Sequence, residues 1–250
     1  MVSHSNVVWI GTPKAYTADM PFVFSLDLHT HTRFFHGDTQ PTWFDPIGTW
    51  LLCGVAKYRG LDGVALTNHD YYRPFECSLV RIPGIEITTT RGHVLVVGPD
   101  PPTNTEPGEL TPEAAVDLAH DRDCAAIIAH PYRNSTVREV AASFDAIEVN
   151  GKHPRTREAV ERLAEHHDLP LVGGSDAHYP FEVGRAYTAI DAEDLSPEHV
   201  VAAIRDRRVE PRVTDSIVNR LFWWLYHRIH AHKRTLDQPG IGPPPGEEET

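Results

Sequence analysis

The chain has 250 residues, of which 40% are hydrophobic and 23% charged, and its formal net charge is −12. This length and composition suffice for one large catalytic α/β domain with a well-buried core. The negative charge disfavours nonspecific attraction to nucleic acid and to anionic membranes, so we expect no strong binding of duplex DNA. No apolar run is long enough to predict a signal sequence or stable insertion into a membrane.

The cysteine pattern bears on the cellular compartment. Cys53, Cys77 and Cys124 are odd in number, widely spaced and lack a C-x-x-C pair. This spacing predicts neither a disulfide framework nor a thiolate zinc site, and it is typical of a protein in a reducing environment. We therefore expect a cytoplasmic protein.

Apolar strand-like segments alternate with helix-like segments along the chain. The first strand is expected at 23–28, where VFSLDL alternates apolar and polar residues. Further strands, apolar on both faces as in a parallel sheet, are expected at 63–67, 84–88, 93–98, 125–130, 146–150, 171–175 and 186–190. Helices are expected at 45–59, 111–122, 155–167 and 196–207. These repeated units predict a (β/α) barrel or an open doubly wound sheet.

The stretch SLDLHTHTRFFHG holds three closely spaced histidines, His29, His31 and His36. On a strand, His29 and His31 project from the same face, and two neutral imidazoles side by side form a metal clamp. A single histidine beside a strand is more often a structural residue. The H-x-H spacing with a third histidine nearby favours metal binding.

More histidines and carboxylates fall at or just after the C-terminal ends of the expected strands. These residues are His69, Glu86, His130, His153, Asp176 and His178. Each of them, taken alone, is more often a loop or capping residue. However, the C-terminal ends of parallel strands form one face of an α/β fold, so the repeated coincidence predicts a single cluster.

Five motifs, DLHTHT, ALTNHD, GIE, AHP and GGSDAH, occur in this order between residues 24 and 190. Their set and order resemble the PHP (polymerase and histidinol phosphatase) family of metal-dependent phosphoesterases. The resemblance implies a distorted (β/α)7 barrel with two or three divalent ions, Zn, Mn or Fe, at its C-terminal face.

The resemblance also implies a set of metal ligands. His29 and His31 look like ligands of one ion, which Glu86 and Asp176 complete. Glu86 would bridge to a second ion held by His130 and His153. A third ion would take His36, His69 and His178, with His36 at the position where many relatives carry the Asp of an SDG turn.

Three further positions bear on the site. Asn68 stands where the family more often has the Asp of TDH, and an amide brings no negative charge to orient the adjacent imidazole. Asp27 is expected either to orient a ligand or to serve as a plain strand-end hydrogen-bond acceptor. Arg185 is our first choice for a cation that reaches a substrate phosphate, with Arg133 and Lys152 as the other candidates.

Clustered divalent ions favour hydrolysis of a phosphoester by a metal-activated hydroxide. We expect a phosphatase-like hydrolase that acts on a small phosphorylated substrate, either a phosphomonoester or a small nucleotide or oligonucleotide. A noncatalytic metal-binding accessory module is one alternative. An amidohydrolase-type metal hydrolase is another, although that family would lead us to expect a bridging lysine. His93 falls at a strand start, so it is expected to be structural or pocket-lining.

The expected organisation has four parts. Residues 1–21 form an N-terminal extension, 22–210 the PHP domain, 211–237 a C-terminal amphipathic helix, and 238–250 a disordered tail. In the third segment Ile217, Leu221, Trp224, Leu225 and Ile229 share one helical face. Packing on the barrel, a homo-oligomer interface and contact with a membrane surface are the three interpretations of that face.

Overall fold

The computed structural model describes residues 24–33, 39–133, 135–214 and 220. The predicted N-terminal extension, His36 and most of the predicted C-terminal helix and tail lie outside these residues. The described strands are β1 (Phe24–Thr30), β2 (Gly63–Leu66), β3 (Val80–Thr89), β4 (Gly92–Val97), β5 (Ala125–Ile128), β6 (Ala146–Asn150), β7 (Leu171–Gly174), β8 (Ala186–Ile190) and β9 (Val209–Val213). The α-helices are α1 (Asp45–Tyr58), α2 (Pro112–His120), α3 (Arg157–His167) and α4 (Pro197–Arg205).

The helix boundaries follow from local sequence signals. The Thr111 side chain accepts a hydrogen bond from the backbone N–H of Ala114 at the start of α2, and Ser196 does the same for His199 at the start of α4. Both helices carry a proline in the first turn, where a missing N–H is harmless. The predicted helices are therefore confirmed, each with ends shifted by a few residues.

The strands form one sheet in the order β7-β6-β5-β4-β3-β2-β1-β8-β9. The pairs β1–β2, β2–β3, β5–β6 and β6–β7 are parallel. The strands β4 and β8 run antiparallel to both of their neighbours. The expectation that all these apolar strands are parallel is therefore wrong for two of them, because antiparallel strands buried on both faces carry the same apolar pattern.

The sheet curls into a nearly closed barrel. Thr30, at the end of β1, forms a bridge with Ala177, which follows β7. The hydroxyl of Thr188 on β8 accepts from the N–H of Gly173 on β7 at 2.8 Å and donates to its carbonyl at 2.9 Å. A side chain at position 173 would collide with the backbone of Tyr187, so glycine permits this close approach. The distorted barrel that the resemblance implies is confirmed, with a mixed sheet.

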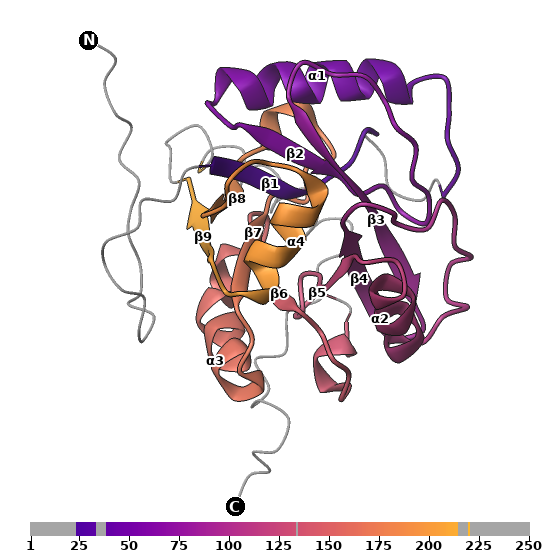
Figure 1. Ribbon diagram of the computed structural model, residues 1–250, viewed down its shortest axis with the longest axis vertical. Coiled ribbons are helices and arrows are strands. Elements are labelled where there is room, and N and C mark those ends of the chain that lie inside the picture. The colour runs from indigo at the N-terminus through magenta and orange to yellow at the C-terminus, as the bar shows by residue number, and fades with distance from the viewer. Residues whose placement is uncertain (1–23, 34–38, 134, 215–219, 221–250) are drawn as a thin grey trace, which may run out of the picture.

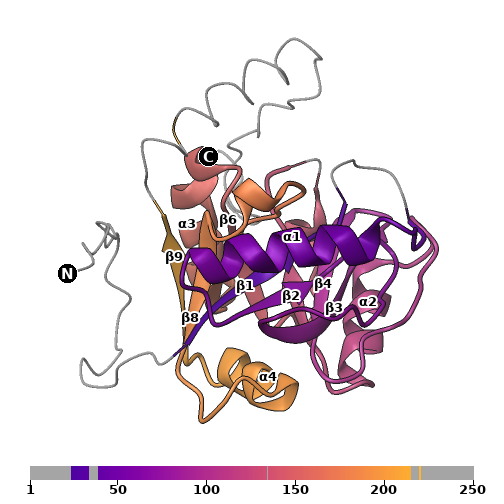
Figure 2. The same ribbon diagram turned by 90° about the horizontal axis from the view of Figure 1, so that it is seen from above.

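The helices close the barrel from three sides (Figures 1 and 2). Buried residues of α4, including Val200 and Ile204, pack with Leu26, Ala125 and Ala146 at the N-terminal ends of the strands. The helices α2 and α3 cover the outer face of β3 to β6, and α1 covers β2. Since α4 blocks one end of the barrel, the opposite end is the one available for a site.

The C-terminal segment departs from the expected boundary at 210. Residues 209–213 form β9, which pairs with β8 along its whole length. The first residues of the segment predicted as a helix over 211–237 therefore belong to the sheet. None of the described helices has the length and apolar character that crossing a bilayer requires.

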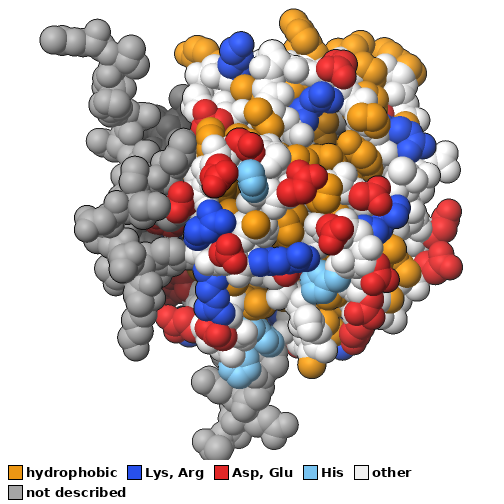
Figure 3. All heavy atoms as spheres, viewed as in Figure 1, with side chains coloured by type: hydrophobic (Ala, Val, Ile, Leu, Met, Phe, Trp, Pro, Cys, Tyr) orange, Lys and Arg blue, Asp and Glu red, His pale blue; other side chains and the backbone are white. Residues whose placement is uncertain are grey.

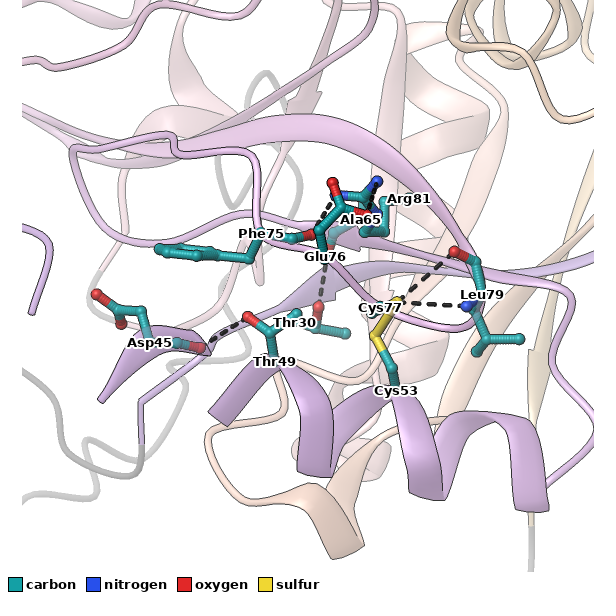
Figure 4. The surroundings of a disulfide bond; sticks show 10 residues. All are labelled: Thr30, Asp45, Thr49, Cys53, Ala65, Phe75, Glu76, Cys77, Leu79 and Arg81. Carbon is teal, nitrogen blue, oxygen red and sulfur yellow. Dashed lines mark hydrogen bonds and ion pairs between the residues drawn. A yellow bond between two sulfur atoms is a disulfide. The ribbon is translucent and has the colours of Figure 1, made fainter. Parts of the chain in front are cut away.

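A disulfide joins Cys53 on α1 to Cys77 in the loop between β2 and β3 (Figure 4). The two Cα atoms are 6.1 Å apart, which is within the usual range for a disulfide. The expectation of no disulfide is therefore wrong, because pairing between distant cysteines depends on a tertiary contact that spacing does not reveal. Disulfides persist mainly in oxidising compartments, so this bond bears on the cytoplasmic location, which stays a prediction.

Candidate metal centre

The predicted ligands within the described residues converge at the C-terminal ends of the parallel strands. His29 lies in β1 and His31 just after it, and Glu86 lies in β3. The remaining members follow their strands: His69 after β2, His130 after β5, His153 after β6, and Asp176 and His178 after β7. Four overlapping groups of these side chains, one including His93, have ligand atoms close enough together to hold an ion.

The tightest group consists of His29, His31, Glu86 and Asp176. Nε2 of His29 lies 3.1 Å from Nε2 of His31. Glu86 Oε2 is 3.3 Å from each of these nitrogens, and Asp176 Oδ1 is 3.4 Å from His31 and 3.8 Å from His29. Ligands of a tetrahedral ion bound at about 2.1 Å are separated by about 3.4 Å. The spacing of His29, His31 and Asp176 is close to that of ligands of one ion, and Glu86 Oε2 lies at a similar distance from both histidines.

Glu86 is shared between this group and a second one. Its Oε1 lies 2.8 Å from Nδ1 of His93 and 3.0 Å from Nε2 of His130, whereas its Oε2 also lies 3.0 Å from Nδ1 of His69. Burial alone would raise the pKa of Glu86, but His69, His93 and His29 around it hold that pKa well below its ordinary value. The carboxylate is thus ionised at the point where the groups meet, which suits a bridging ligand.

Burial favours the neutral form of five imidazoles, whereas the carboxylates beside His29 and His93 raise the pKa of those two. Burial lowers the pKa of His31, His69, His130 and His178, and it lowers that of His153 to about 3. Neutral imidazole is the form that binds a metal ion. Nε2 of His153 and Nδ1 of His130 are buried and have no hydrogen-bond partner among the described residues. This donor set fits divalent ions such as Zn, Mn or Fe.

His153 lies near His130 without joining any of the four groups. Both residues line one small pocket together with Arg133, Glu148 and Asn150. The second ion between His130 and His153 stays a prediction, and His36 of the predicted third ion lies outside the described residues.

Two residues of the site have strained backbone. His130 has φ of 24° and Asp176 has φ of 52°, in a region that non-glycine residues rarely adopt. Such strain persists where the surrounding structure fixes a functional side chain. Asp176 is held on both sides, since the N–H of Ser175 donates to Asp27 and Ala177 bridges to Thr30.

Glu148 orients His29, and sequence analysis missed it. Glu148 lies in β6, is fully buried, and accepts from Nδ1 of His29 at 2.8 Å. Its other oxygen accepts from the N–H of His130 at 2.7 Å and from the Asn150 side chain at 3.1 Å. Burial would lower the pKa of His29, but Glu148 and Glu86 raise it well above its ordinary value. A lone glutamate in the apolar strand AIEVN was the available signal, as in GIEIT for Glu86.

The comparisons with known proteins agree with this geometry. Residues 154–209 match the model of the PHP-associated family. PsfC from Pseudomonas syringae has a similar structure, with a TM-score of 0.63 at 19% identity over 82% of this chain and 98% of that one. A two-domain protein from Bacteroides vulgatus containing a predicted PHP-like metal-dependent phosphoesterase has a TM-score of 0.55 at 20% identity, over 86% and 70% of the two chains. Residues 154–209 are thus similar to a PHP-associated domain, and the chain has a PHP-type fold.

A third similar structure is that of the lesion-specific endonuclease PfuEndoQ from Pyrococcus furiosus. Its TM-score is 0.53 at 19% identity, and the match covers 73% of this chain and 56% of that one. No curated protein sequence matches the chain significantly. At these identities the solved structures establish the fold, and the activity has to be argued from the site.

Asp27 lies in β1, two residues before His29, and is fully buried. Its carboxylate accepts from the backbone N–H groups of Ser175 at 2.9 Å, His29 at 3.2 Å and Gly184 at 2.7 Å. Burial raises the pKa of Asp27 to about 6, although these hydrogen bonds oppose the rise. These contacts tie β1 to the loops around β7, which supports the interpretation as a strand-end acceptor.

The contacts of the three candidate phosphate-binding cations differ from the ranking that the sequence suggested. The described contacts of Arg185 run to Glu182 at 3.4 Å and to the ring of Phe181. By contrast, Arg133 lies 2.8 Å from Asp176 Oδ2, and Lys152 Nζ lies 3.2 Å from Asp176 Oδ1. The two secondary candidates are thus the cations that contact a predicted ligand, whereas the role of Arg185 stays a prediction.

The position of His93 and the contacts of Asn68 were not predicted from the sequence. His93 begins β4, and because β4 is antiparallel, its start lies at the same barrel end as the predicted ligands. Asn68 accepts from the N–H of Thr32 at 2.9 Å and from its hydroxyl at 3.0 Å. Asn68 therefore fixes the chain just after His31, a task that requires an acceptor and no negative charge.

Proposed function

We propose that the protein is a metal-dependent phosphoesterase that hydrolyses a phosphomonoester, or a small nucleotide or oligonucleotide. The observation that carries this proposal is the shared carboxylate of Glu86, which faces His29 and His31 with one oxygen and His130 with the other. A carboxylate between two sets of imidazoles is what a centre with two adjacent ions requires.

Three groups of residues would hold the ions. His29, His31, Glu86 and Asp176 would hold the first, and Glu86, His130 and His153 the second. His69 and His178, with His36, are the residues proposed for a third. When bound, such ions lower the pKa of a water ligand and neutralise negative charge on phosphoryl oxygens.

The chain's own basic residues complete the proposed site. Arg133 has a side chain that is 32% exposed and whose guanidinium lies 2.8 Å from Asp176, so it can reach a phosphate at the rim of the centre. Nδ1 of His29 lies 2.8 Å from Glu148, and a proton held there would leave Nε2 for an ion that displaces its proton. The carboxylates of Glu86 and Asp176 are ionised and most of the proposed histidine ligands are neutral, which are the forms that ligation needs.

The structure also bears on the two alternatives. In an amidohydrolase-type site we would expect a lysine in the bridging position, but here a carboxylate, Glu86, lies between the two groups. Lys152 contacts Asp176 and His178 instead. An accessory module without turnover would share the same fold, so this alternative has to be tested by activity.

The decisive experiment is a substrate panel. The protein is stripped with a chelator, reloaded with Mn, Zn or Fe, and assayed on phosphomonoesters, phosphodiesters, nucleotides and an amide. We expect metal-dependent release of phosphate or a nucleotide and no amide cleavage. A Glu86→Gln preparation made in parallel reports any contaminating phosphatase. Stoichiometric metal binding without turnover on any ester would favour the accessory module, and amide cleavage would favour the amidohydrolase type.

A further inference from the structure

Asp45 is a fully buried carboxylate that belongs to none of the proposed ligand groups. It begins α1 (Figure 4) and lies outside the five motifs of the sequence. Burying a charge is costly unless that charge is paired and hydrogen-bonded. Its Oδ1 lies 2.6 Å from the hydroxyl of Thr32, 3.1 Å from Nε of Arg33 and 3.0 Å from the hydroxyl of Tyr71, and its Oδ2 accepts from the N–H of Thr42 at 2.6 Å. Three of these four donors come from segments that carry proposed metal ligands.

The segment after His31 and the segment around His69 meet at this carboxylate. Thr32 directly follows His31, and Tyr71 comes two residues after His69. The same two segments are also joined directly, because the N–H of Thr32 donates to the side chain of Asn68 at 2.9 Å. The carboxylate on α1 is therefore a second tie between the two segments, and it comes from a third element of the fold.

The rings of His31 and His69 need a fixed spacing, because both face the same oxygen atom. Nε2 of His31 lies 3.3 Å from Oε2 of Glu86, and Nδ1 of His69 lies 3.0 Å from it. The two rings stack with their centroids 4.6 Å apart. Groups that bind a ligand or an ion have to be held within about 0.5 Å of the productive geometry. A shift of either segment would move one ring relative to Glu86.

The helix that carries Asp45 is itself fixed against both segments. Gly48, in the first turn of α1, lies directly on the chain after His31, since a Cβ at position 48 would collide with the carbonyl group of Thr32. Further along α1, Cys53 is joined by the disulfide to Cys77, in the loop between β2 and β3. The support for the carboxylate is thus rigid on both sides.

We propose that Asp45 is a positioning residue of the metal centre, which fixes His31 and His69 at the spacing that ion binding needs. The inference rests on the proposed metal centre and adds to it a residue that contacts no ion. The carboxylate acts through the hydroxyls of Thr32 and Tyr71. An asparagine at this position has one acceptor oxygen in place of two and no charge, so at least one of the four donors loses its partner.

The test measures metal binding by Asp45→Asn in the full chain. Chelator-stripped protein is titrated with Mn or Zn by calorimetry and with Co(II), whose visible absorption reports the geometry of its ligands. Loss of a group that orients a metal ligand typically costs about 10- to 100-fold in affinity, so Asp45→Asn should bind its ions at least about tenfold more weakly, with an altered Co(II) spectrum. Tyr71→Phe removes one donor and should cause a smaller loss. The two losses should not add in the double variant, because the hydroxyl acts through the carboxylate.

Asp145→Asn is the matched control. Asp145 also pairs with an arginine and with a backbone donor, since its Oδ1 lies 3.1 Å from Nε of Arg205 and its Oδ2 accepts from the N–H of Ala126 at 2.8 Å. It directly precedes β6, at the end of the barrel opposite the candidate metal centre. This variant should lower the free energy of unfolding and leave the metal affinity and the Co(II) spectrum unchanged.

The outcomes distinguish this inference from the proposed function. A folded Asp45→Asn protein with wild-type affinity and spectrum, or an equal loss of affinity in Asp145→Asn, would overturn the inference and leave the metal-dependent esterase standing. If Asp45→Asn does not fold, unchanged metal binding by Tyr71→Phe overturns it, and weakened binding with an altered spectrum supports it. No bound ion in wild type would overturn both proposals.

Discussion

Replacing Glu148 by Gln should weaken metal binding without touching any proposed ligand. The carboxylate of Glu148 faces three donors: Nδ1 of His29, the N–H of His130 and the amide of Asn150. A glutamine offers one acceptor oxygen. If that oxygen stays with His130 and Asn150, the new amide N–H₂ faces Nδ1 of His29, which must then accept. The imidazole proton moves to Nε2, the nitrogen that faces Glu86 and Asp176.

The size of the effect follows from this change. Loss of a carboxylate that orients a metal-binding histidine typically costs about 10- to 100-fold in metal affinity or activity, which corresponds to about 1.4 to 2.7 kcal/mol. The alternative amide orientation preserves His29 but leaves a buried backbone donor of His130 unpaired, at a cost of about 1 to 3 kcal/mol in the free energy of unfolding. Either orientation gives a measurable loss.

Asp27→Asn is the matched control. Asp27 is also a fully buried carboxylate, but its partners are the backbone N–H groups of His29, Ser175 and Gly184 and the side chain of Ser175, with no imidazole among them. Both variants should lower the free energy of unfolding in denaturant titrations, whereas only Glu148→Gln should lower the affinity for Mn or Zn measured by calorimetry. Equal metal affinities in the two variants would refute the assignment of Glu148 to His29.

Four other outcomes are expected. Glu86→Gln should lose more bound metal and more turnover on a phosphomonoester than His36→Ala, and the reverse order would show that Glu86 is not the bridge. Chelation should lower the melting temperature, and free metal at 100 times its Kd should restore about 2.7 kcal/mol, whereas a melting temperature indifferent to metal would contradict the centre. Unreduced protein should show one reactive thiol in denaturant and none in the native state at pH 8, because Cys53 is paired with Cys77 and burial raises the pKa of Cys124 to about 11. Cys53→Ser should lower the free energy of unfolding by about 3 kcal/mol, since the disulfide joins residues with a sequence separation of 24. Filter binding at physiological salt should detect no tight, nonspecific complex with duplex DNA. The reason is that acidic and basic side chains are interspersed on the face shown in Figure 3, without a continuous basic stripe.

The convergence of the candidate ligands could be predicted from the sequence because the C-terminal ends of parallel strands lie at the same end of the barrel. His29, His69, His130 and Asp176 lie in or after strands that run the same way, so their ends meet regardless of the separation along the chain. Short apolar strands and capped helices provide enough signal to place those ends. The convergence did not require any tertiary contact to be known in advance.

The same rule explains the place of His93. It was expected to be structural or pocket-lining because it begins a strand, and it lies beside Glu86 because β4 runs antiparallel to β3 and β5 and so begins where its neighbours end. Apolar composition does not report strand direction when both faces are buried. The turn between β3 and β4 ends at Gly92, which has φ of 134°. A glycine between two apolar segments is typical of a hairpin, and it was the sequence feature that could have indicated the reversal.

Contacts between loops were beyond sequence reasoning. Arg133, Lys152 and Arg185 all follow motif residues closely, and their side chains are similar in length. Which cation faces Asp176 depends on how the loops after β5, β6 and β7 pack, and this packing places Arg133 and Lys152 against Asp176. The pairing of Cys53 with Cys77 likewise depends on where the loop after β2 crosses α1.

The burial of charge explains why this barrel end is suited to ions rather than to a merely structural role. Glu86 and Asp176 are at most 1% exposed, and the groups around them hold both of their pKa values well below the ordinary range, so both carry charge. Removing an ion from water costs several kcal/mol, so a buried carboxylate needs a compensating positive charge. Arg133 and Lys152 lie against Asp176, but the contacts of Glu86 are to histidines, of which His29 and His93 have a raised pKa. The proposed metal centre would supply the remaining positive charge to Glu86.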